Sequence, residues 1–284
     1  MTNVIACIDG SAASPAVCDY AAWSSRQMDA PLVLLHVLDK SAFPSGKRNL
    51  SGNLTFGNRE SLLNELAELD AQRNKIALEQ GRLMLEEAYD RVKAAGIAEA
   101  DRRQRHGDLL ETLVELQEET RLLVLGKEGE HADSLGEHIG SNVESVVRTV
   151  RRPVLVTTTE YTEPRRIMIA YDGGHTTRKC VEMVAGSPLF KGLPVHVVMV
   201  GDDKPENRAQ LDWARETLQA AGFEAPACIQ AGDVETVLCN YRKEHAIDLI
   251  VMGAYGHSRI RQFLVGSTTA NVVRHAHVPV LLLR

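Results

Sequence analysis

The sequence predicts two α/β domains, each with a mostly parallel sheet covered by helices on both faces. Apolar segments typical of strands alternate with amphipathic segments typical of helices, and the whole pattern occurs twice. The 284 residues suffice for two domains of ordinary size. We expect the domains at residues 1–159 and 160–284, because the polar segment 157–164 ends in proline.

The two halves align segment by segment. Both begin with a strand, a turn, a helix and a strand, and Asp9-Gly10 of the first aligns with Asp172-Gly173 of the second. The aligned ranges are 3–39 with 166–201, 106–126 with 231–253, and 140–156 with 266–282. The carboxyl ends of parallel strands form the edge where open α/β sheets bind ligands, so both aspartates are expected there.

Helix starts can be assigned from capping residues. Ser14 is followed by Pro15, which predicts a helix whose first amides are capped by the Ser14 hydroxyl. In the second half, residues 208–223 have apolar residues at helical spacing. Asp233 is expected to cap the helix that follows.

A glycine-rich loop follows the apolar strand 249–252. Gly253, Gly256 and Gly266 allow the backbone to turn sharply and to approach a ligand closely. The amides at the start of the next helix lack intrahelical partners, so with the helix dipole they favour an anion such as phosphate. The loop is also cationic, with His257, Arg259 and Arg261. The simpler alternative is a turn that only joins the strand to the helix.

The spacing G-x2-G-x9-G-[ST] resembles the nucleotide loop of the universal stress protein family. Gly253, Gly256, Gly266 and Ser267 match it position by position, and the doubled arrangement looks like the tandem class of that family. The resemblance implies two five-stranded sheets of the adenine nucleotide alpha hydrolase-like type. It also implies that the last strands, at 153–158 and 279–284, pair the two domains as a pseudo-dimer, and it leaves a homodimer of two chains open.

The resemblance further implies ATP as the ligand, with or without Mg²⁺, in the C-terminal domain. Asp172 would contact the adenosine, and Met199, or Val37 in the first copy, would pack against adenine. Simple turn chemistry for Asp172 and a plain core position for Met199 remain open. The residues implied to bind the nucleotide are Asp172, Met199, Gly253, Gly256, His257, Arg259, Gly266, Ser267 and Thr268.

The first copy of the site is predicted to be degenerate. Ten residues separate Gly129 from Gly140, and Lys127 faces four acidic residues in the same loop. Glu144 completes an S-x-x-E capping box where the second copy has Ala270. Whether this copy binds anything stays open for its residues Asp9, Gly126, Gly129, Gly140 and Ser141.

The first copy also carries an insertion at about residues 40–74. Its front half is rich in Ser, Gly and Asn and predicts a surface loop, and a helix is expected over 60–95. Large apolar residues recur in this helix every seven positions, at Leu62, Leu69, Ile76 and Leu83. They are consistent with a helix that packs on a partner helix. We favour the interpretation that they cover the molecule's own sheet, because Arg73 and Gln80 are polar at the companion positions, the second core position of each seven-residue repeat. A lid over a nucleotide site is a third hypothesis.

Composition excludes several functions. A net charge of −6 argues against a general nucleic-acid binder. No apolar run approaches the ~20 residues of a membrane span, and the first strand starts at Asn3, so we expect a cytoplasmic protein without a signal peptide. The five cysteines lack CxxC spacing and indicate buried free thiols. No histidine pair has a carboxylate or thiol nearby in the sequence that would complete a metal site.

Three hypotheses remain from the sequence. The first is an ATP-binding regulatory protein of the stress response. The second is a scaffold of the same fold that binds no nucleotide, or binds a small apolar ligand. The third is a slow ATPase, for which Arg259 and Arg261 without a group to position water are weak support.

Overall fold

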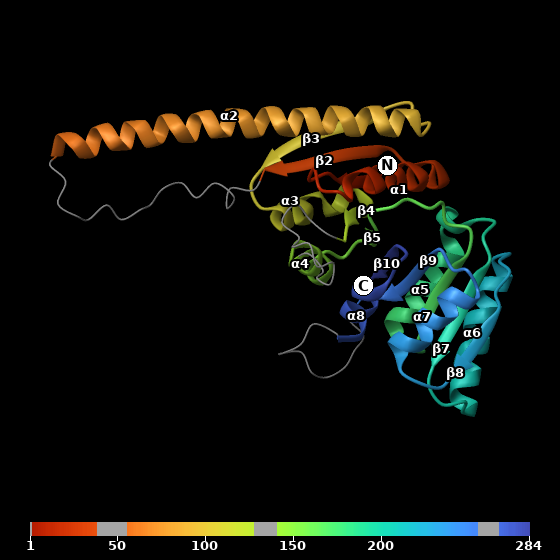
Figure 1. The fold of residues 1–284 in the computed structure, drawn as a ribbon. Coiled ribbons are helices and arrows are strands. Elements are labelled where there is room, and N and C mark those ends of the chain that lie inside the picture. Colours follow the sequence, from red (N-terminus) through yellow and green to blue (C-terminus); the bar gives the residue numbers. More distant parts are fainter. Residues whose placement is uncertain (1, 39–55, 128–140, 255–266) are drawn as a thin grey trace.

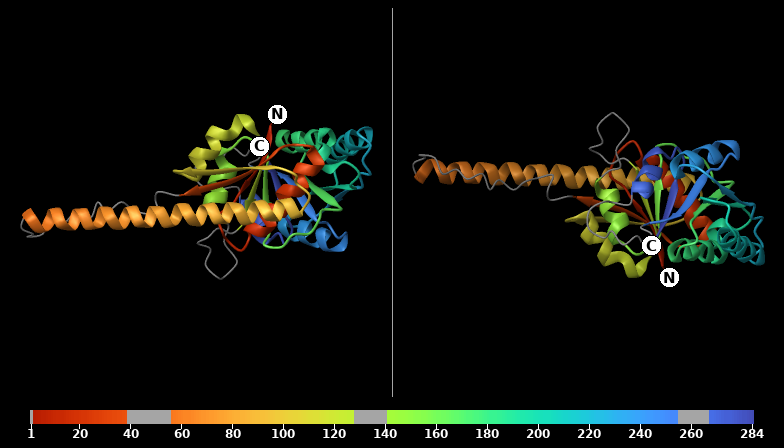
Figure 2. Two further views of the ribbon diagram at one scale, coloured as in Figure 1. Left: turned by 90° about the horizontal axis from the view of Figure 1, so that it is seen from above. Right: turned by 90° about the horizontal axis from the view of Figure 1, so that it is seen from below.

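The computed structural model describes residues 2–38, 56–127, 141–254 and 267–284. In these residues the strands form a single sheet in the order β3-β2-β1-β4-β5-β10-β9-β6-β7-β8 (Figure 1). The first five strands in this order come from the first half of the chain and the last five from the second half. Helices flank the sheet, and one of them, α2, extends far beyond it (Figure 2).

The first half forms a five-stranded parallel sheet. Its elements are β1 (Asn3–Cys7), α1 (Ser14–Met28), β2 (Leu32–Leu38), α2 (Phe56–Ala94), β3 (Ala100–His106), α3 (Leu109–Glu115), the 3₁₀ helix η2 (Leu116–Glu119), β4 (Thr120–Gly126), α4 (Ser141–Thr149) and β5 (Val154–Thr157). The chain moves from β1 outward to β3 and then returns to the other side of β1.

The second half repeats this topology. Its elements are β6 (Ile167–Tyr171), α5 (His175–Gly186), the 3₁₀ helix η3 (Pro188–Phe190), β7 (Val195–Val200), α6 (Pro205–Ala220), β8 (Ala227–Gln230), α7 (Val234–Glu244), β9 (Leu249–Gly253), α8 (Ser267–His275) and β10 (Val280–Leu283). The strands pair in parallel, with β6 between β9 and β7.

The two sheets meet at the last strand of each half. β5 and β10 run antiparallel, with Leu155 opposite Leu281, so each strand covers an apolar edge that the other would expose. The expected fold class is therefore confirmed: two mostly parallel five-stranded sheets with helices on both faces, packed as a pseudo-dimer.

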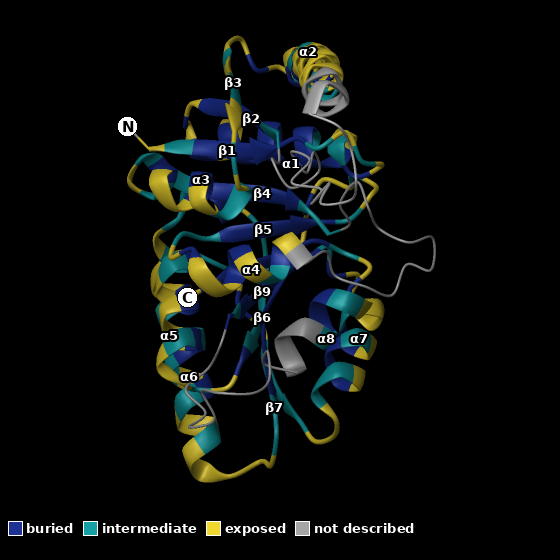
Figure 3. Ribbon diagram, turned by 90° about the vertical axis from the view of Figure 1, so that its left-hand side faces the viewer, coloured by how far each residue is buried: buried dark blue, intermediate teal, exposed yellow. Residues whose placement is uncertain are grey.

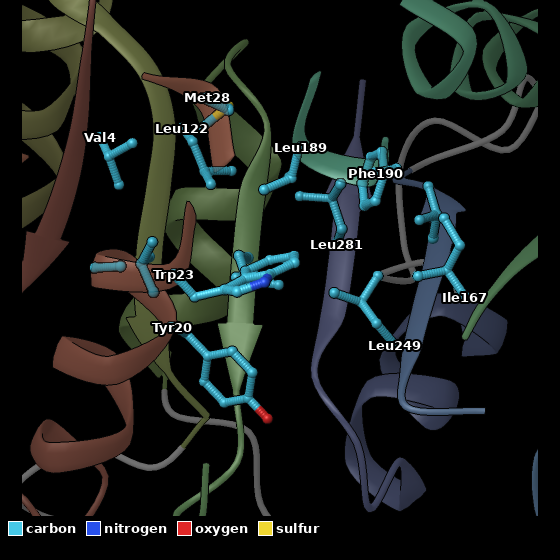
Figure 4. Packing of buried hydrophobic residues seen from close by; sticks show 14 of the residues in the cluster. Val4, Tyr20, Trp23, Met28, Leu122, Ile167, Leu189, Phe190, Leu249 and Leu281 are labelled. Atoms are coloured by element: carbon cyan, nitrogen blue, oxygen red, sulfur yellow. The ribbon is translucent and has the colours of Figure 1, made fainter. Parts of the chain in front are cut away.

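One apolar core runs through both halves on one side of the sheet. Trp23 and Tyr20 of α1 are each 1% exposed and belong to the same buried cluster as Leu189 and Phe190 of η3 (Figure 4). The Tyr20 hydroxyl also accepts a hydrogen bond from the Thr162 amide at 3.2 Å, which ties α1 to the connecting segment. The two halves are thus held together by side-chain packing as well as by strand pairing.

The expected capping residues differ in outcome. Asp233 does cap α7, since its Oδ1 accepts the Thr236 amide at 3.0 Å. Ser14 does not cap α1: the N-cap residue is Ala13, and the Ser14 hydroxyl instead donates to Asp9 Oδ1 at 2.9 Å. The hydroxyl oxygen accepts the Gly10 amide at 3.1 Å, and its proton forms a charge-assisted hydrogen bond with Asp9, so both of its functions serve the turn before the helix.

Helix α2 is anchored at its C-terminal half only. Its buried residues Ala77, Leu85, Ala88 and Val92 face α1, β2 and β3, and Arg91 forms a two-pronged ion pair with Asp19 of α1 at 2.7 and 3.0 Å. Among residues 64–76, all described, no side chain is buried. Figure 3 looks along this helix and shows its exposed surface.

The favoured interpretation of the seven-residue repeat is therefore wrong. Leu69, Ile76 and Leu83 are 45%, 59% and 51% exposed, so they do not cover the sheet of their own molecule. The rest of the molecule packs against a different face of α2. The helix starts at Phe56, four residues earlier than expected. The insertion loop up to residue 55 lies outside the described residues. No described helix is both long and apolar enough to cross a membrane.

Candidate functional site at the carboxyl edge of the C-terminal sheet

The strand register brings three of the predicted residues to one edge. Tyr171 of β6 pairs with Met199 of β7, and Ala170 pairs with Met252 of β9. Asp172 directly follows β6, and Gly253 is the last residue of β9. Residues far apart in the sequence thus meet where the parallel strands end.

The two carboxylate oxygens of Asp172 differ in the hydrogen bonds that they accept from the described residues. Its Oδ1 accepts the Gly174 amide at 2.8 Å and the Thr177 hydroxyl at 2.6 Å, which fixes the carboxylate against the first turn of α5. Among the described residues, none donates a hydrogen bond to Oδ2, and Asp172 is exposed. The second oxygen is therefore available to accept a hydrogen bond from a ligand hydroxyl or amine.

Gly253 lies tightly against the same turn of α5. A Cβ at this position would stand 3.0 Å from Thr176 Cγ2 and 3.5 Å from Thr177 Cγ2. Because Thr177 also binds Asp172, the glycine and the carboxylate share one support. Any side chain at position 253 would push on the helix start that orients Asp172.

The Asp172-Gly173 turn is covered from α6. Gly173 has a φ of +74°, which favours glycine, and a Cβ there would stand 1.5 Å from Gln210 Oε1, so any other residue would also displace the Gln210 side chain. Gln210 therefore brings an amide group to the turn that carries Asp172. Sequence reasoning did not include this residue, because nothing in helical periodicity shows which neighbouring loop a side chain will touch.

Met199 is 2% exposed and belongs to the buried core beneath this edge. The strand register also corrects its expected counterpart. Val4 pairs with Leu32 as Ile167 pairs with Val195, so the residue that corresponds to Met199 in the first half is His36, not Val37.

Several predicted residues lie outside the described part of the chain. These are Gly256, His257, Arg259 and Gly266, together with Arg261. Helix α8 begins at Ser267, as the loop pattern requires, but the side chains of Ser267 and Thr268 are not described.

The corresponding edge of the N-terminal sheet is covered by α2. A Cβ on Gly10, whose φ is +75°, would stand 2.7 Å from Met84 Cε, so this thioether lies over the Asp9-Gly10 turn. Gly81 of the same helix lies against His36: its Cβ would stand 2.6 Å from His36 Cδ2. The His36 Nδ1 atom is 2.7 Å from the Ile8 carbonyl, which holds the ring in place.

The N-terminal loop begins with a cation that is already engaged. Lys127 Nζ donates a hydrogen bond to the Arg274 carbonyl at the end of α8, in the other half of the chain. Gly126 ends β4, and Ser141 begins α4 with its side chain undescribed. Gly129 and Gly140 lie outside the described residues.

A hydroxyl five residues after each aspartate was missed as part of the site. Thr177 follows Asp172 and Ser14 follows Asp9 at the same spacing, and both hydroxyls donate to the aspartate Oδ1. The repeat D-x4-[ST] is visible in the aligned sequences and could have predicted this support. A serine before a proline also fits a helix cap, so the pattern at Ser14 has two interpretations that only the contacts separate.

A separate cavity of about 730 Å³ lies between the two halves, away from Asp172. Its lining includes Tyr20, Asp248 and four basic side chains from the last turns of α7 and α8: Arg242, Lys243, Arg274 and His275. Cations at helix C-termini compensate the unpaired carbonyls there, which accounts for this cluster without a ligand.

The thiols near the two edges are suited to packing rather than to chemistry. Burial raises the pKa of Cys7 and of Cys180 to about 12, so neither forms a thiolate near neutral pH. Cys7, Cys18 and Cys180 are buried, Cys228 and Cys239 are half-buried, and all five are free. In the described residues, no group of three or more potential metal ligands gathers.

Comparison with known proteins gives a consistent result. Residues 1–158 and 163–284 each match the universal stress protein family. Universal stress protein Slr1230 of Synechocystis is 35% identical over 287 residues, which cover all of both chains.

Solved structures show the same fold at lower identity. A universal stress protein from Archaeoglobus fulgidus superposes with a TM-score of 0.69 at 19% identity, covering 99% of this chain and 96% of the other. A protein of unknown function from Pseudomonas aeruginosa, PA1789, superposes with a TM-score of 0.59 at 16% identity, covering 100% and 92%. At these identities the likeness concerns the fold alone.

Proposed function

This chain belongs to the universal stress protein family, in tandem form, and on that premise we propose that its C-terminal domain binds ATP and that the protein regulates a stress response. The observation that carries the proposal is the Asp172 carboxylate. One oxygen is fixed by Gly174 and Thr177, and no group in the described part of the chain donates to the other, which lies at the sheet edge where β9 ends at Gly253.

Each part of the nucleotide has a suitable partner in this proposal. The open oxygen of Asp172 accepts hydrogen bonds from the ribose hydroxyls, and Met199 forms the apolar floor beneath adenine. The amides at the start of α8, which begins at Ser267, hold the phosphates together with Gly256, His257, Arg259, Gly266 and Thr268. Mg²⁺ would accompany the phosphates as it does in solution.

The N-terminal domain is proposed to bind no nucleotide with comparable affinity. The position of Met199 is taken by His36, which is packed under Gly81 of α2. Met84 lies over the Asp9-Gly10 turn, and Lys127 is bound to the Arg274 carbonyl. We therefore expect one ATP per chain.

A reducing compartment such as the cytoplasm fits the chain. All five cysteines are free thiols, and none of them pairs in a disulfide. Catalysis is not part of the proposal, since the described residues around Asp172 include no activated nucleophile.

Calorimetric titration of the full chain with ATP and Mg²⁺ tests the proposal. The wild type should bind one equivalent, and Gly266→Val and Gly253→Val should abolish binding. Gly126→Val in the N-terminal domain is the matched control and should leave the affinity unchanged. Unfolding by urea must be compared for each variant, because a side chain at 253 also presses on Thr176. If ATP binds both C-terminal variants as it binds the wild type, the glycine loop is not the site.

A further inference from the structure

Helix α2 carries an apolar stripe that its own molecule does not cover. Leu69, Ile76 and Leu83 follow one another at seven-residue spacing and are all exposed. Of the five large apolar side chains exposed in the described residues, four lie on α2, the fourth being Leu78. The stripe therefore concentrates exposed apolar surface on one element.

The stripe faces away from the surface that anchors the helix. At about 100° per residue, Ile76 and Leu83 lie roughly a third of a turn from the face formed by Ala77, Leu85 and Ala88. Hence a partner can lie along the stripe even where α2 rests on its own body. Since the stability of helices in proteins comes mainly from packing an apolar face, a partner for this segment is expected.

We propose that the stripe binds the same stripe of a second copy of this chain, so that two α2 helices pair antiparallel. Charge selects this occupant and orientation. Residues 60–71 hold four acidic residues and no basic one, a net charge of −4. Residues 74–85, which lie opposite residues 60–71 in such a pair, hold Lys75 and Arg82 against Glu79, a net charge of +1. An antiparallel pair sets −4 against +1 at both ends, whereas a parallel pair sets −4 against −4.

The spacing of the stripe fits this orientation. A pair centred between residues 72 and 73 places Leu69 of each helix opposite Ile76 of the other, so that apolar side chains meet in both directions. The two bodies then stand at opposite ends of the paired helices, because each is anchored at the C-terminal half of its own helix (Figure 2). Arg73 and Gln80 at the companion positions favour one register over others, as polar core residues do in coiled coils.

Sedimentation equilibrium of the full chain tests the pairing. The wild type should reach twice the mass of one chain at micromolar concentration. The double variant Leu69→Gln/Ile76→Gln should weaken the dimer by about tenfold or more. Leu78→Gln, which removes another exposed leucine about 200° around the same helix from Ile76, is the matched control and should not weaken it. A monomeric wild type, or a double variant that associates like the wild type, overturns the proposal.

Disulfide trapping tests the orientation. The variants Glu65→Cys and Gln80→Cys, both at exposed positions, are mixed and oxidised, with the wild type as control for its own thiols. The antiparallel pair predicts cross-links between 65 and 80. Cross-links of 65 with 65 in their place overturn the antiparallel arrangement. The inference does not rest on nucleotide binding, so either proposal can fail without the other.

Discussion

The role of Asp172 can be separated into turn formation and ligand binding by two substitutions. In Asp172→Asn, the amide oxygen can still accept the hydrogen bonds of Gly174 and Thr177, while an NH₂ group replaces the open oxygen. In Asp172→Ala, both functions are lost. If the carboxylate only shapes the turn, the two variants differ in stability, but neither specifically changes the affinity for ATP.

The expected magnitudes follow from the contacts. Hydrogen bonds to charged groups contribute about 1.5–3 kcal/mol each, and the exposure of Asp172 favours the lower end. Loss of the ligand bond in Asp172→Asn should therefore raise the Kd for ATP by about tenfold, since ~1.4 kcal/mol corresponds to a factor of ten. Its free energy of unfolding should fall by no more than about 1 kcal/mol, whereas that of Asp172→Ala should fall by about 2 kcal/mol.

Calorimetric titration with ATP and urea unfolding, each done on both variants, measure these quantities. Asp9→Asn is the control, because it changes the aligned aspartate in the domain that is proposed not to bind. An unchanged Kd in Asp172→Asn would refute the reasoning and leave Asp172 a turn residue. An equal loss of affinity in Asp9→Asn would show that ATP binds in the N-terminal domain, either in place of the C-terminal site or in addition to it.

Three further predictions concern stability and reactivity. Phe190→Ala should lower the free energy of unfolding by about 3–5 kcal/mol, with a single urea transition because both halves share this core; two separate transitions would contradict it. Burial and the nearby His245 lower the pKa of His196 below 6.5, so the wild type should lose stability as the pH falls below that value, and His196→Gln should lose less over the same range by urea titration. Cys180, with a pKa of about 12, should react with a thiol reagent at neutral pH only after unfolding, and labelling of the native protein at this residue would show that the core opens.

The difference between the two domains shows what aligned sequences leave out. Asp9 and Asp172 are supported in the same way, by a hydroxyl five residues later. The helices that follow the second strand then bring different groups over the turn, Met84 of α2 in one half and Gln210 of α6 in the other. Equal motifs therefore lie in unequal surroundings, which only contacts between distant segments reveal.

The sequence alone determined the two α/β domains, their doubled order of elements and the placement of Asp172 and Gly253 at one edge of the sheet. Those features follow from local causes: apolar alternation selects strands, capping residues such as Asp233 start helices, and parallel strands carry their C-terminal residues to one edge. Tertiary structure decided that Ser14 binds Asp9 and that the stripe containing Ile76 is exposed. Periodicity shows that a helix has an apolar face, but what covers that face depends on elements brought close by folding, and the same pattern serves an internal sheet or a second molecule equally well.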